Sequence, residues 1–511
     1  MRRLVVVPSL LLVVLAAGAF APSTAISTPG SSDAAVARNF ELVGHAGLFD
    51  RGMNSALAIY RHFVYVGDRT DGGDLCVPAS GVPSAHGCPH SHPGVLVVDA
   101  ADPAHPHVVD RIGPPLEGNV GETARELRVW PQKRLLAVFN FACGAAFGAC
   151  SSATVTPTVR FYDLTGANAA HPKLISTYRP STQPHEIYLW LDPKNRDRAL
   201  LFMTTFENDN APLGAPNLIA TDISGARHGR FREIAHTNLV RLYPKSLLER
   251  TEVDVHSISL TPDGRQGYLS VWGGTFLVVD TSQFAAGVAH PHFKLLTAVG
   301  DRPRWTNAHA HSAVPILGTH DVLTTDEVYG NYTTPFDIGQ QTDGCPWGWV
   351  HIIDVADPAH PRLVAQYRLH QNHPAFCDTP AGQNPRNTDF TSYSTHNPTV
   401  LGDLALIAWH SNGLRAVNLS DPTQPRSAGA FVPRPLPHVV TTDPALGRTV
   451  SVSKVIMWSY PIIYNGLIYV DDIRNGLYIL RYTGPHADEV SHINYLEGNS
   501  NRGDAMRLRG S

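Results

Sequence analysis

The sequence lacks a dense basic cluster, and it lacks a long apolar run beyond its first residues. Its 511 residues carry 40 Lys and Arg against 44 Asp and Glu, for a formal net charge of -4. A nucleic-acid partner needs a dense basic face for its phosphates, so we expect no such partner. No stretch after residue 25 is long and apolar enough to span a bilayer, so we expect no membrane span after signal removal.

Two catalytic signatures and one type of periodicity are also missing. No glycine-rich phosphate loop follows a strand, and no G-x-S-x-G nucleophile turn is present. Sustained helical periodicity is absent, and only 16% of the residues are charged. The chain instead has 42 glycines and 40 prolines, which favours a turn-rich all-β protein.

The first residues have the pattern of a secretory signal peptide. Arg2 and Arg3 precede an apolar run over residues 4–21, and small residues follow as far as Ala25. This pattern predicts cleavage after Ala25 and a secreted, extracellular protein. The run is also close to the length of a membrane span, so an uncleaved anchor that keeps the protein at the cell surface is the alternative.

Six cysteines in an exported chain predict three disulfide bonds. Proximity in sequence suggests three local pairs, which are Cys76 with Cys88, Cys143 with Cys150, and Cys345 with Cys377. Fifteen connectivities are open to six cysteines, so only proximity supports this pairing.

An apolar strand that ends in Asp or Asn, a turn usually framed by proline and a second strand recur at roughly sixty-residue intervals. Examples are "GVLVVDAADPAHPHVV" (94–109), "VHIIDVADPAHPRLV" (350–364) and "LRAVNLSDPTQPRSAG" (414–429). A further hairpin precedes each copy, as in "VHSISLTPDGRQGYLSVWGG" (255–274).

The repeats predict an all-β fold, namely a seven-bladed β-propeller of four-stranded antiparallel blades. We expect a signal peptide at 1–25, an N-terminal lead-in at 26–54 and the propeller at 55–484. The C-terminal tail at 485–511 is expected to be partly disordered, because it is polar and follows the last repeat.

The recurring element resembles the LVIVD repeat, which is named for its apolar third strand. "STHNPTVLGDLALIAWHSNGLRAVNLSDPTQP" (394–425) resembles the histidine-led blade of that family. The resemblance implies a secreted or surface propeller without an assigned reaction. The cysteine-bearing insertions and the rewritten turn of the last repeat, "GLIYVDDIRNGLYILRYTG" (466–484), depart from the family pattern.

The 26 histidines fall into two classes once the repeats are in register. One class lies in the turn between the third and fourth strands, where solvated turn residues are expected. Its members are His105, His171, His290 and His360.

The second class stands at the start of the first strand of four consecutive repeats, as His185, His256, His311 and His396, with Arg125 at the same place in the second repeat. First strands line the channel of a propeller, so these residues should form a ring around one mouth. The antiparallel second strand returns to that mouth. Its end residues are Asp68, Asn140, Thr205, Trp272, Asp326, His410 and Asp471.

Four or five imidazoles beside carboxylates predict a transition-metal site. The candidate ligands are His185, His256, His311, His396 and His410. Nitrogen-rich sites without thiolates suit Fe, Cu, Zn or Ni rather than Mg or Ca. The alternative is that each histidine only satisfies a backbone group at the end of a blade.

Two other propeller families offer weaker comparisons. "QPHEIYLWLDP" (183–193) resembles the proline-histidine-glutamate strand of the selenium-binding protein and methanethiol oxidase family. Carotenoid oxygenases, an analogy of architecture only, hold iron with four histidines. These comparisons imply a metal that activates dioxygen or a small thiol.

The leading functional hypothesis is an extracellular binding or scaffold protein with a histidine-ring metal site and an unidentified small-molecule or protein partner. The alternatives are a metal-dependent oxidoreductase on the same ring and a structural cell-surface module without metal.

Overall fold

The computed structural model describes most of the repeat region and leaves out several connecting segments. The described residues are 34–69, 91–114, 116, 122–142, 157–205, 214–242, 254–272, 275–298, 300–306, 308–328, 344–383, 392–439 and 454–498. The predicted signal peptide and the cysteines at 76, 88, 143 and 150 lie outside them.

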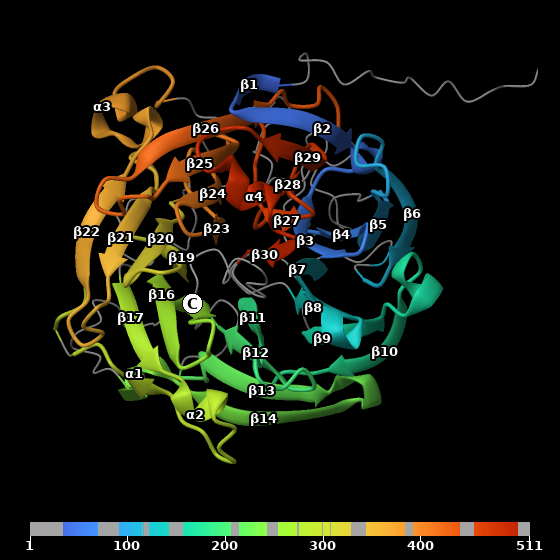
Figure 1. Cartoon of the computed structure of the whole chain (residues 1–511), viewed down its shortest axis with the longest axis vertical. Helices are drawn as coiled ribbons and strands as arrows, with labels where there is room; N and C mark the ends of the chain where they lie inside the picture. The colour runs from blue at the N-terminus through green and yellow to red at the C-terminus, as the bar shows by residue number, and fades with distance from the viewer. Residues whose placement is uncertain are drawn as a thin grey trace, which may run out of the picture.

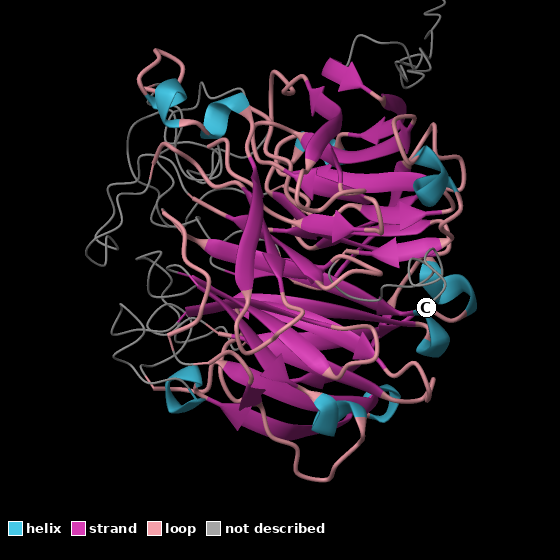
Figure 2. Ribbon diagram, turned by 60° about the vertical axis from the view of Figure 1, so that its left-hand side comes forward, coloured by secondary structure: helices cyan, strands magenta, loops and turns pink. Residues whose placement is uncertain are grey.

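The described strands form antiparallel sheets arranged around a central axis (Figure 1), and Figure 2 shows these sheets from the side. Five blades have four strands each, and the first two are joined into one eight-stranded sheet by a bridge between Asp68 and Ala124. A Cβ atom at Gly67 would lie 2.0 Å from the carbonyl oxygen of Ala124, so glycine allows this close approach.

The strands of these five blades are, in chain order, β3 (Asn54–Tyr60), β4 (Phe63–Asp68), β5 (Val95–Asp99) and β6 (His107–Ile112); β7 (Glu122–Trp130), β8 (Leu135–Ala142), β9 (Thr158–Asp163) and β10 (Lys173–Tyr178); β11 (Glu186–Leu191), β12 (Ala199–Thr204), β13 (Leu218–Gly225) and β14 (Arg230–Thr237); β15 (Asp254–Leu260), β16 (Gln266–Trp272), β17 (Thr275–Asp280) and β18 (Lys294–Leu295); β19 (Ala310–Pro315), β20 (Asp321–Asp326), β21 (Val350–Asp354) and β22 (Arg362–Tyr367).

Two five-stranded sheets complete the ring, and each contains a strand from the N-terminal segment. Figure 1 shows the blue N-terminal strands beside orange and red C-terminal ones. The first sheet has the order β1 (Ala34–Arg38), β26 (Arg426–Pro433), β25 (Leu414–Asn418), β24 (Leu404–Ala408) and β23 (Pro398–Val400). The second has the order β2 (Phe40–Ala46), β29 (Gly476–Tyr482), β28 (Leu467–Asp472), β27 (Ile462–Tyr464) and β30 (Tyr495–Glu497).

The prediction of seven four-stranded blades is therefore wrong. The described propeller has five four-stranded blades, and its remaining sheets are five-stranded. The error has a physical reason: β1 and β30 lie outside the repeats, so the repeat pattern gives no signal for them. They nevertheless pair antiparallel with β26 and β27, with a register shift between Ala34 and Val36 in the first pair.

Helices in the described part of the chain are short, and none is long and apolar enough to cross a membrane. The α-helices are α1 (Leu239–Leu242), α2 (Ser282–Ala285), α3 (Pro374–Cys377) and α4 (Ala487–Ser491). The 3-10 helices are η1 (Leu48–Asp50), η3 (Pro131–Lys133), η5 (Gly166–Ala169), η6 (Ala226–His228) and η8 (His370–Asn372).

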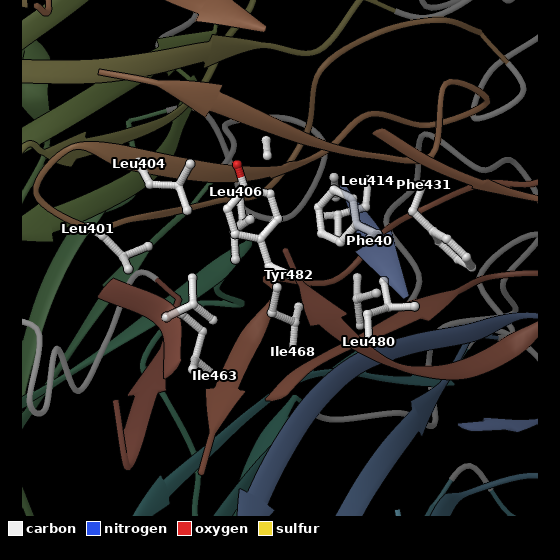
Figure 3. Close-up of a cluster of buried hydrophobic side chains, with 14 of the residues drawn as sticks. Phe40, Leu401, Leu404, Leu406, Leu414, Phe431, Ile463, Ile468, Leu480 and Tyr482 are labelled. Carbon is white, nitrogen blue, oxygen red and sulfur yellow. The ribbon is translucent and has the colours of Figure 1, made fainter. Parts of the chain in front are cut away.

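The hydrophobic core lies between neighbouring blades, because inner strands such as β4 and β12 are buried on both faces. Figure 3 shows one such layer, where Leu404 and Leu406 of β24 meet Ile468 of β28. Phe40 of β2 packs at the edge of the same layer, with its ring 5.1 Å from that of Tyr482. Burial of this N-terminal aromatic ring helps to hold the closing strand against the C-terminal sheet.

One predicted disulfide bond is confirmed. Cys345 and Cys377 are bonded, with their Cα atoms 5.4 Å apart. The bond joins the segment before β21 to helix α3. A disulfide bond favours an oxidising environment for this protein.

Candidate metal centre

The ring residues occupy irregular positions in the innermost strands of their blades. In β15, Val255 pairs with Val271 and Ser257 with Ser270, so His256 is an extra residue in the ladder. In β19 the extra residue is His311. A β-bulge of this kind breaks the alternation of side chains and redirects the extra residue.

The same irregularity recurs at the other ring positions. Arg125 is the extra residue in β7 and Ala56 is the extra residue in β3. His185 donates its backbone N–H to Thr204, which also pairs with Glu186. The backbone N–H of His396 donates to the carbonyl oxygen of Ala408 at 2.9 Å. The repeated bulge is thus the structural reason why a histidine stands at the head of so many repeats.

The structure brings all five sequence-predicted histidines together in one buried row. His185 is the most exposed of them at 7%, and His410 is 0% exposed. The Nε2 atoms of His185 and His256 lie 3.1 Å apart. The ring centroid of His311 lies 3.8 Å from that of His256 and 4.1 Å from that of His396.

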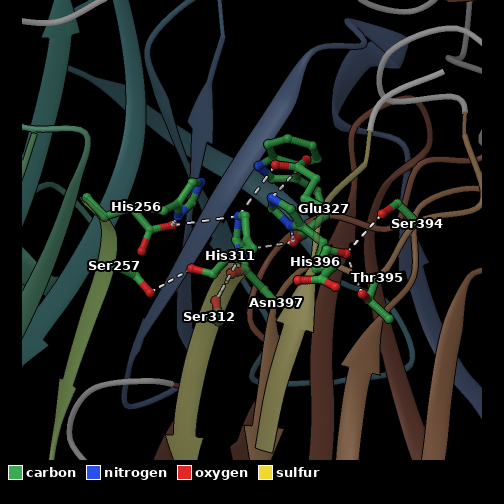
Figure 4. A network of polar contacts seen from close by, with 12 residues as sticks. His256, Ser257, His311, Ser312, Glu327, Ser394, Thr395, His396 and Asn397 are labelled. Atoms are coloured by element: carbon green, nitrogen blue, oxygen red, sulfur yellow. Dashed lines mark hydrogen bonds and ion pairs between the residues drawn. The ribbon is translucent and has the colours of Figure 1, made fainter. Parts of the chain in front are cut away.

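Two glutamates that the sequence reasoning missed lie along this row. Glu186 Oε1 is 3.4 Å from His256 Nδ1 and 3.8 Å from His311 Nε2. Glu327 Oε2 is 3.7 Å from His311 Nε2, and Figure 4 shows Glu327 beside His311 and His396. Both carboxylates are buried, at 5% and 1% exposure.

Three imidazoles converge on the carboxylate of Glu327. Its Oε1 atom lies 3.5 Å from His396 Nε2 and 3.1 Å from His410 Nε2, in addition to the contact of Oε2 with His311. The ligand atoms of His311, Glu327 and His396 all lie within 4.8 Å of one another. This spacing is compatible with ligands around one metal ion.

The opposite ring nitrogens of these histidines are fixed by hydrogen bonds. His396 Nδ1 lies 2.7 Å from the carbonyl oxygen of Trp458, so Nδ1 carries the proton and donates. Ser392 donates its hydroxyl proton to Val328 O, and it accepts from His410 Nδ1 at 3.2 Å. Both Nε2 atoms then present lone pairs to Glu327 in the neutral imidazoles. Metal-ligating histidines commonly have this second hydrogen bond.

His311 follows the same pattern through the residue next to it. Ser312 donates its hydroxyl proton to Asn397 Oδ1 at 3.5 Å, and His311 Nδ1 lies 2.9 Å from that hydroxyl oxygen. In this arrangement Nδ1 donates to Ser312, and Nε2 presents its lone pair to Glu186 and Glu327. Figure 4 shows His311 beside Glu327.

Burial keeps these imidazoles neutral. It lowers the pKa of His256, His311 and His396 well below the usual 6.5, and the neighbouring histidines lower it further. Burial also raises the pKa of Glu186 well above its usual value, and the charges of Glu126 and Glu327 add to this effect. Burial therefore disfavours the charged forms of both the imidazoles and Glu186.

Glu126 and Arg128 form a buried ion pair on the side of the channel next to this row. Their charged atoms lie 2.7 Å apart. Arg125, directly before Glu126 in the sequence, approaches His185 Nε2 at 3.4 Å. A small cavity of about 10 Å³ lies against these residues and Tyr460, which is room for about one water molecule.

The aspartates at the ends of the second strands do not face the histidine row. Asp326 instead lies 2.7 Å from His351 Nε2 and accepts a hydrogen bond from Trp305. Asp68 accepts from the backbone N–H of Gly94, and Asp471 accepts from that of Ser459. The residue that faces the histidines is Glu327, directly after Asp326. A sequence signal existed only for Glu186, because it follows His185 in the quoted "PHE" stretch.

The family model of the LVIVD repeat matches residues 347–368 and 394–431. The chain is a β-propeller that contains LVIVD repeats in these two segments. The second matched segment contains His396 and His410, so two residues of the histidine row lie within a matched LVIVD repeat.

Comparisons with other known proteins add little to this assignment. No curated protein sequence matches the chain. Among solved structures, the β-propeller domain of Myceliophteria thermophila Cps50 (Swd1) is similar with a TM-score of 0.44 and 11% identity, over 87% of this chain and 98% of that one. BamB from Moraxella catarrhalis is similar with a TM-score of 0.35 and 8% identity, over 83% and 80%.

Proposed function

We propose that this LVIVD-repeat propeller is an exported binding or scaffold protein that holds a transition-metal ion at the histidine row. The proposed ligands are His311, His396, His410 and Glu327. The observation that carries the proposal is the convergence of three Nε2 atoms on one carboxylate, within 3.1 to 3.7 Å.

A proton would be a poorer occupant of this position than a metal ion. A single proton between Glu327 and one imidazole serves only that pair of acceptors. A cation serves all three nitrogens and the carboxylate together. In a tetrahedral zinc site, ligands bound at about 2.1 Å lie about 3.4 Å from one another. The measured contacts are near this spacing.

The donor set supports a transition metal rather than magnesium or calcium. Imidazole nitrogen with one carboxylate and no thiolate suits iron, copper or zinc. The hydrogen bonds at Nδ1 of His396 and His410 would orient both rings for binding.

Burial supports a binding or scaffold role over an open catalytic one. His311, His396, His410 and Glu327 are at most 2% exposed. Such a site suits an ion that stabilises one end of the channel. An extracellular partner would then bind the outer surface of the propeller.

The first experiment is elemental analysis of the exported protein, purified without added metal or an affinity tag. We expect at least one equivalent of iron, copper or zinc per chain. His396→Gln should reduce the content by about one equivalent, whereas His360→Gln should not change it. His360 is a matched control, because it is an exposed histidine that pairs with Asp301 at 2.9 Å.

Two results would contradict the proposal: no metal in the unmodified protein, or equal metal content in the protein and in His396→Gln. Glu327→Gln tests the same site without changing side-chain size, so loss of metal there separates ligation from a packing defect. The mass of the exported chain also tests the signal peptide, since cleavage after Ala25 predicts a chain that begins at Ile26.

A metal-dependent oxidoreductase is the second candidate, because four protein ligands leave positions open on a five- or six-coordinate ion. This function requires iron or copper in the site. It predicts consumption of dioxygen with a small thiol, at a rate that His396→Gln abolishes and His360→Gln leaves unchanged. Full occupancy by zinc without such consumption would favour the scaffold function.

A further inference from the structure

The histidine row has a second half, of which the proposed ligand set uses only His311. Glu186 lies between His256 and His311, and its Oε1 atom is 3.4 Å from the first and 3.8 Å from the second. The ligand atoms of these three residues lie within 4.8 Å of one another, as they do around Glu327. All three residues are buried.

The contacts of His185 bear on which ring nitrogen His256 presents to Glu186. Arg125 can only donate, so His185 Nε2 accepts from it at 3.4 Å. His256 Nε2 lies 3.1 Å from the same atom and donates in that contact when the proton of His256 is on Nε2. A neutral His256 with its proton on Nε2 presents the lone pair of Nδ1 to Glu186.

Acceptor atoms therefore alternate along the row. They follow in the order His256 Nδ1, Glu186, His311 Nε2, Glu327 and His396 Nε2, with separations of 3.4 to 3.8 Å. Nitrogen lone pairs and carboxylate oxygens do not attract one another. Each contact needs a proton or a cation between its two atoms.

We propose that a second divalent cation binds between Glu186, His256 and His311, so that the row is a two-metal site. This inference rests on the proposed function, because it extends the same site. His311 Nε2 has one lone pair and can bind only one ion, so with both ions bound His311 would leave the ligand set of the first ion and bind the second. The two ions would thus take two imidazoles and one carboxylate each, with His396, His410 and Glu327 around the first.

This arrangement matches the known use of two histidines and one carboxylate to hold a divalent transition metal. Arg125 contacts His185 Nε2 at 3.4 Å, and this contact removes His185 from the ligand set. The charge of Arg125 also acts on Glu186 and His256. The proposed metal ligands therefore end before His185, the histidine that Arg125 contacts.

The test is the number of Zn²⁺ ions that the full exported chain binds after metal removal with a chelator. We expect two equivalents for the unmodified protein, one for Glu186→Gln, one for Glu327→Gln and none for the double variant. Glutamine has the size of glutamate, and its amide can donate to His256 Nδ1. If a proton rather than an ion lies between Glu186 and His256, Glu186→Gln should therefore stay folded and keep the metal content of the unmodified protein.

The outcomes separate this inference from the proposed function. One equivalent in the unmodified protein that Glu186→Gln leaves unchanged overturns the second ion and leaves the first in place. Two equivalents in both proteins also overturn it, because the second ion would then bind elsewhere. No zinc in the unmodified protein overturns both proposals. If Glu186→Gln fails to fold, His256→Gln gives the same readout, and Glu41→Gln at an exposed ion pair is the control for both.

Discussion

The histidines of the channel and those of the outer rim belong to the same repeats but have different surroundings. At the rim, His105 pairs with Asp102 at 2.7 Å and His360 pairs with Asp301 at 2.9 Å, and all four side chains are half exposed or more. In the channel, His311 lies between two glutamates and is 1% exposed. Water can replace the partner of an exposed rim histidine, whereas a buried channel histidine that loses its partner has no water to replace it. The repeats therefore fix the position of a histidine, and its burial decides its chemistry.

The buried ion pair beside the row should show this contrast most strongly. Arg128→Met leaves Glu126 buried at 6% exposure without its cation, and we expect a loss of about 3 to 5 kcal/mol in the free energy of unfolding. Arg481→Met breaks an exposed pair with Glu41 at 3.1 Å and should cost less than about 1 kcal/mol. Denaturant unfolding of both variants measures the difference. Equal losses would contradict the distinction between channel and rim.

Acid should lower the free energy of unfolding through the histidines of the channel but not through those of the rim. The folded protein lowers the pKa of His256, His311 and His396 below the unfolded value near 6.5, so the unfolded chain binds more protons below that pH. Their contribution to stability is present above pH 6.5 and is lost as the pH falls. We expect a loss of about 1 to 3 kcal/mol between pH 7 and pH 5 in chelator-treated protein.

Unfolding midpoints across this pH range measure the loss. The variant with both His256 and His396 changed to glutamine should have a flatter pH profile than the unmodified protein. His105→Gln should keep the original slope, because that side chain is exposed. A profile that flattens equally in both variants would place the titrating groups outside the channel.

An outer contact between two blades should have a smaller effect. Burial alone would raise the pKa of Asp163, but hydrogen bonds from Thr165, Arg227 and Asn168 outweigh it and lower the pKa to about 2. Arg227 reaches Asp163 from the next blade at 2.7 Å. The stabilisation is present above the unfolded pKa near 3.8 and is lost as the pH falls towards 2.

Asp163→Asn should therefore cost about 1 kcal/mol at pH 6, which is the usual value of one hydrogen-bonded contact. The difference from the unmodified protein should shrink as the pH falls below 3.8. Unfolding midpoints at pH 6 and pH 3 measure it, with Asp301→Asn at the rim as the control. A difference that stays constant with pH would mean that Asp163 acts through packing rather than charge.

The repeats predicted much of the fold because each copy carries its own local signals. The strand and turn of residues 94–109 became β5 and β6, since the apolar run, the aspartate and the prolines all act within a few residues. Pairing between distant segments left no such signal. The ladder between Phe40 and Tyr482 is an example, as is the strand Tyr495–Glu497 inside the last sheet.

The candidate site was predicted by residue type and register, but its carboxylates were not. A strand read by strict alternation places His185 and Glu186 on opposite faces, whereas the bulge sets both opposite Thr204. Glu327 lies just beyond β20, where no periodicity applies. The acidic residues that register did place at this mouth, such as Asp326, are bound by other partners.

The smallest effect is expected at the rim, for a substitution that keeps the histidine and changes only its partner. Asp102→Asn removes the carboxylate 2.7 Å from His105 Nδ1, while the amide oxygen can still accept that hydrogen bond. Both side chains are 63% exposed, so water and salt already weaken the pair. We expect no measurable change in the denaturation midpoint and no change in metal content. A larger loss, measured in the same denaturant series, would mean that the proline-framed turns help to hold neighbouring blades together.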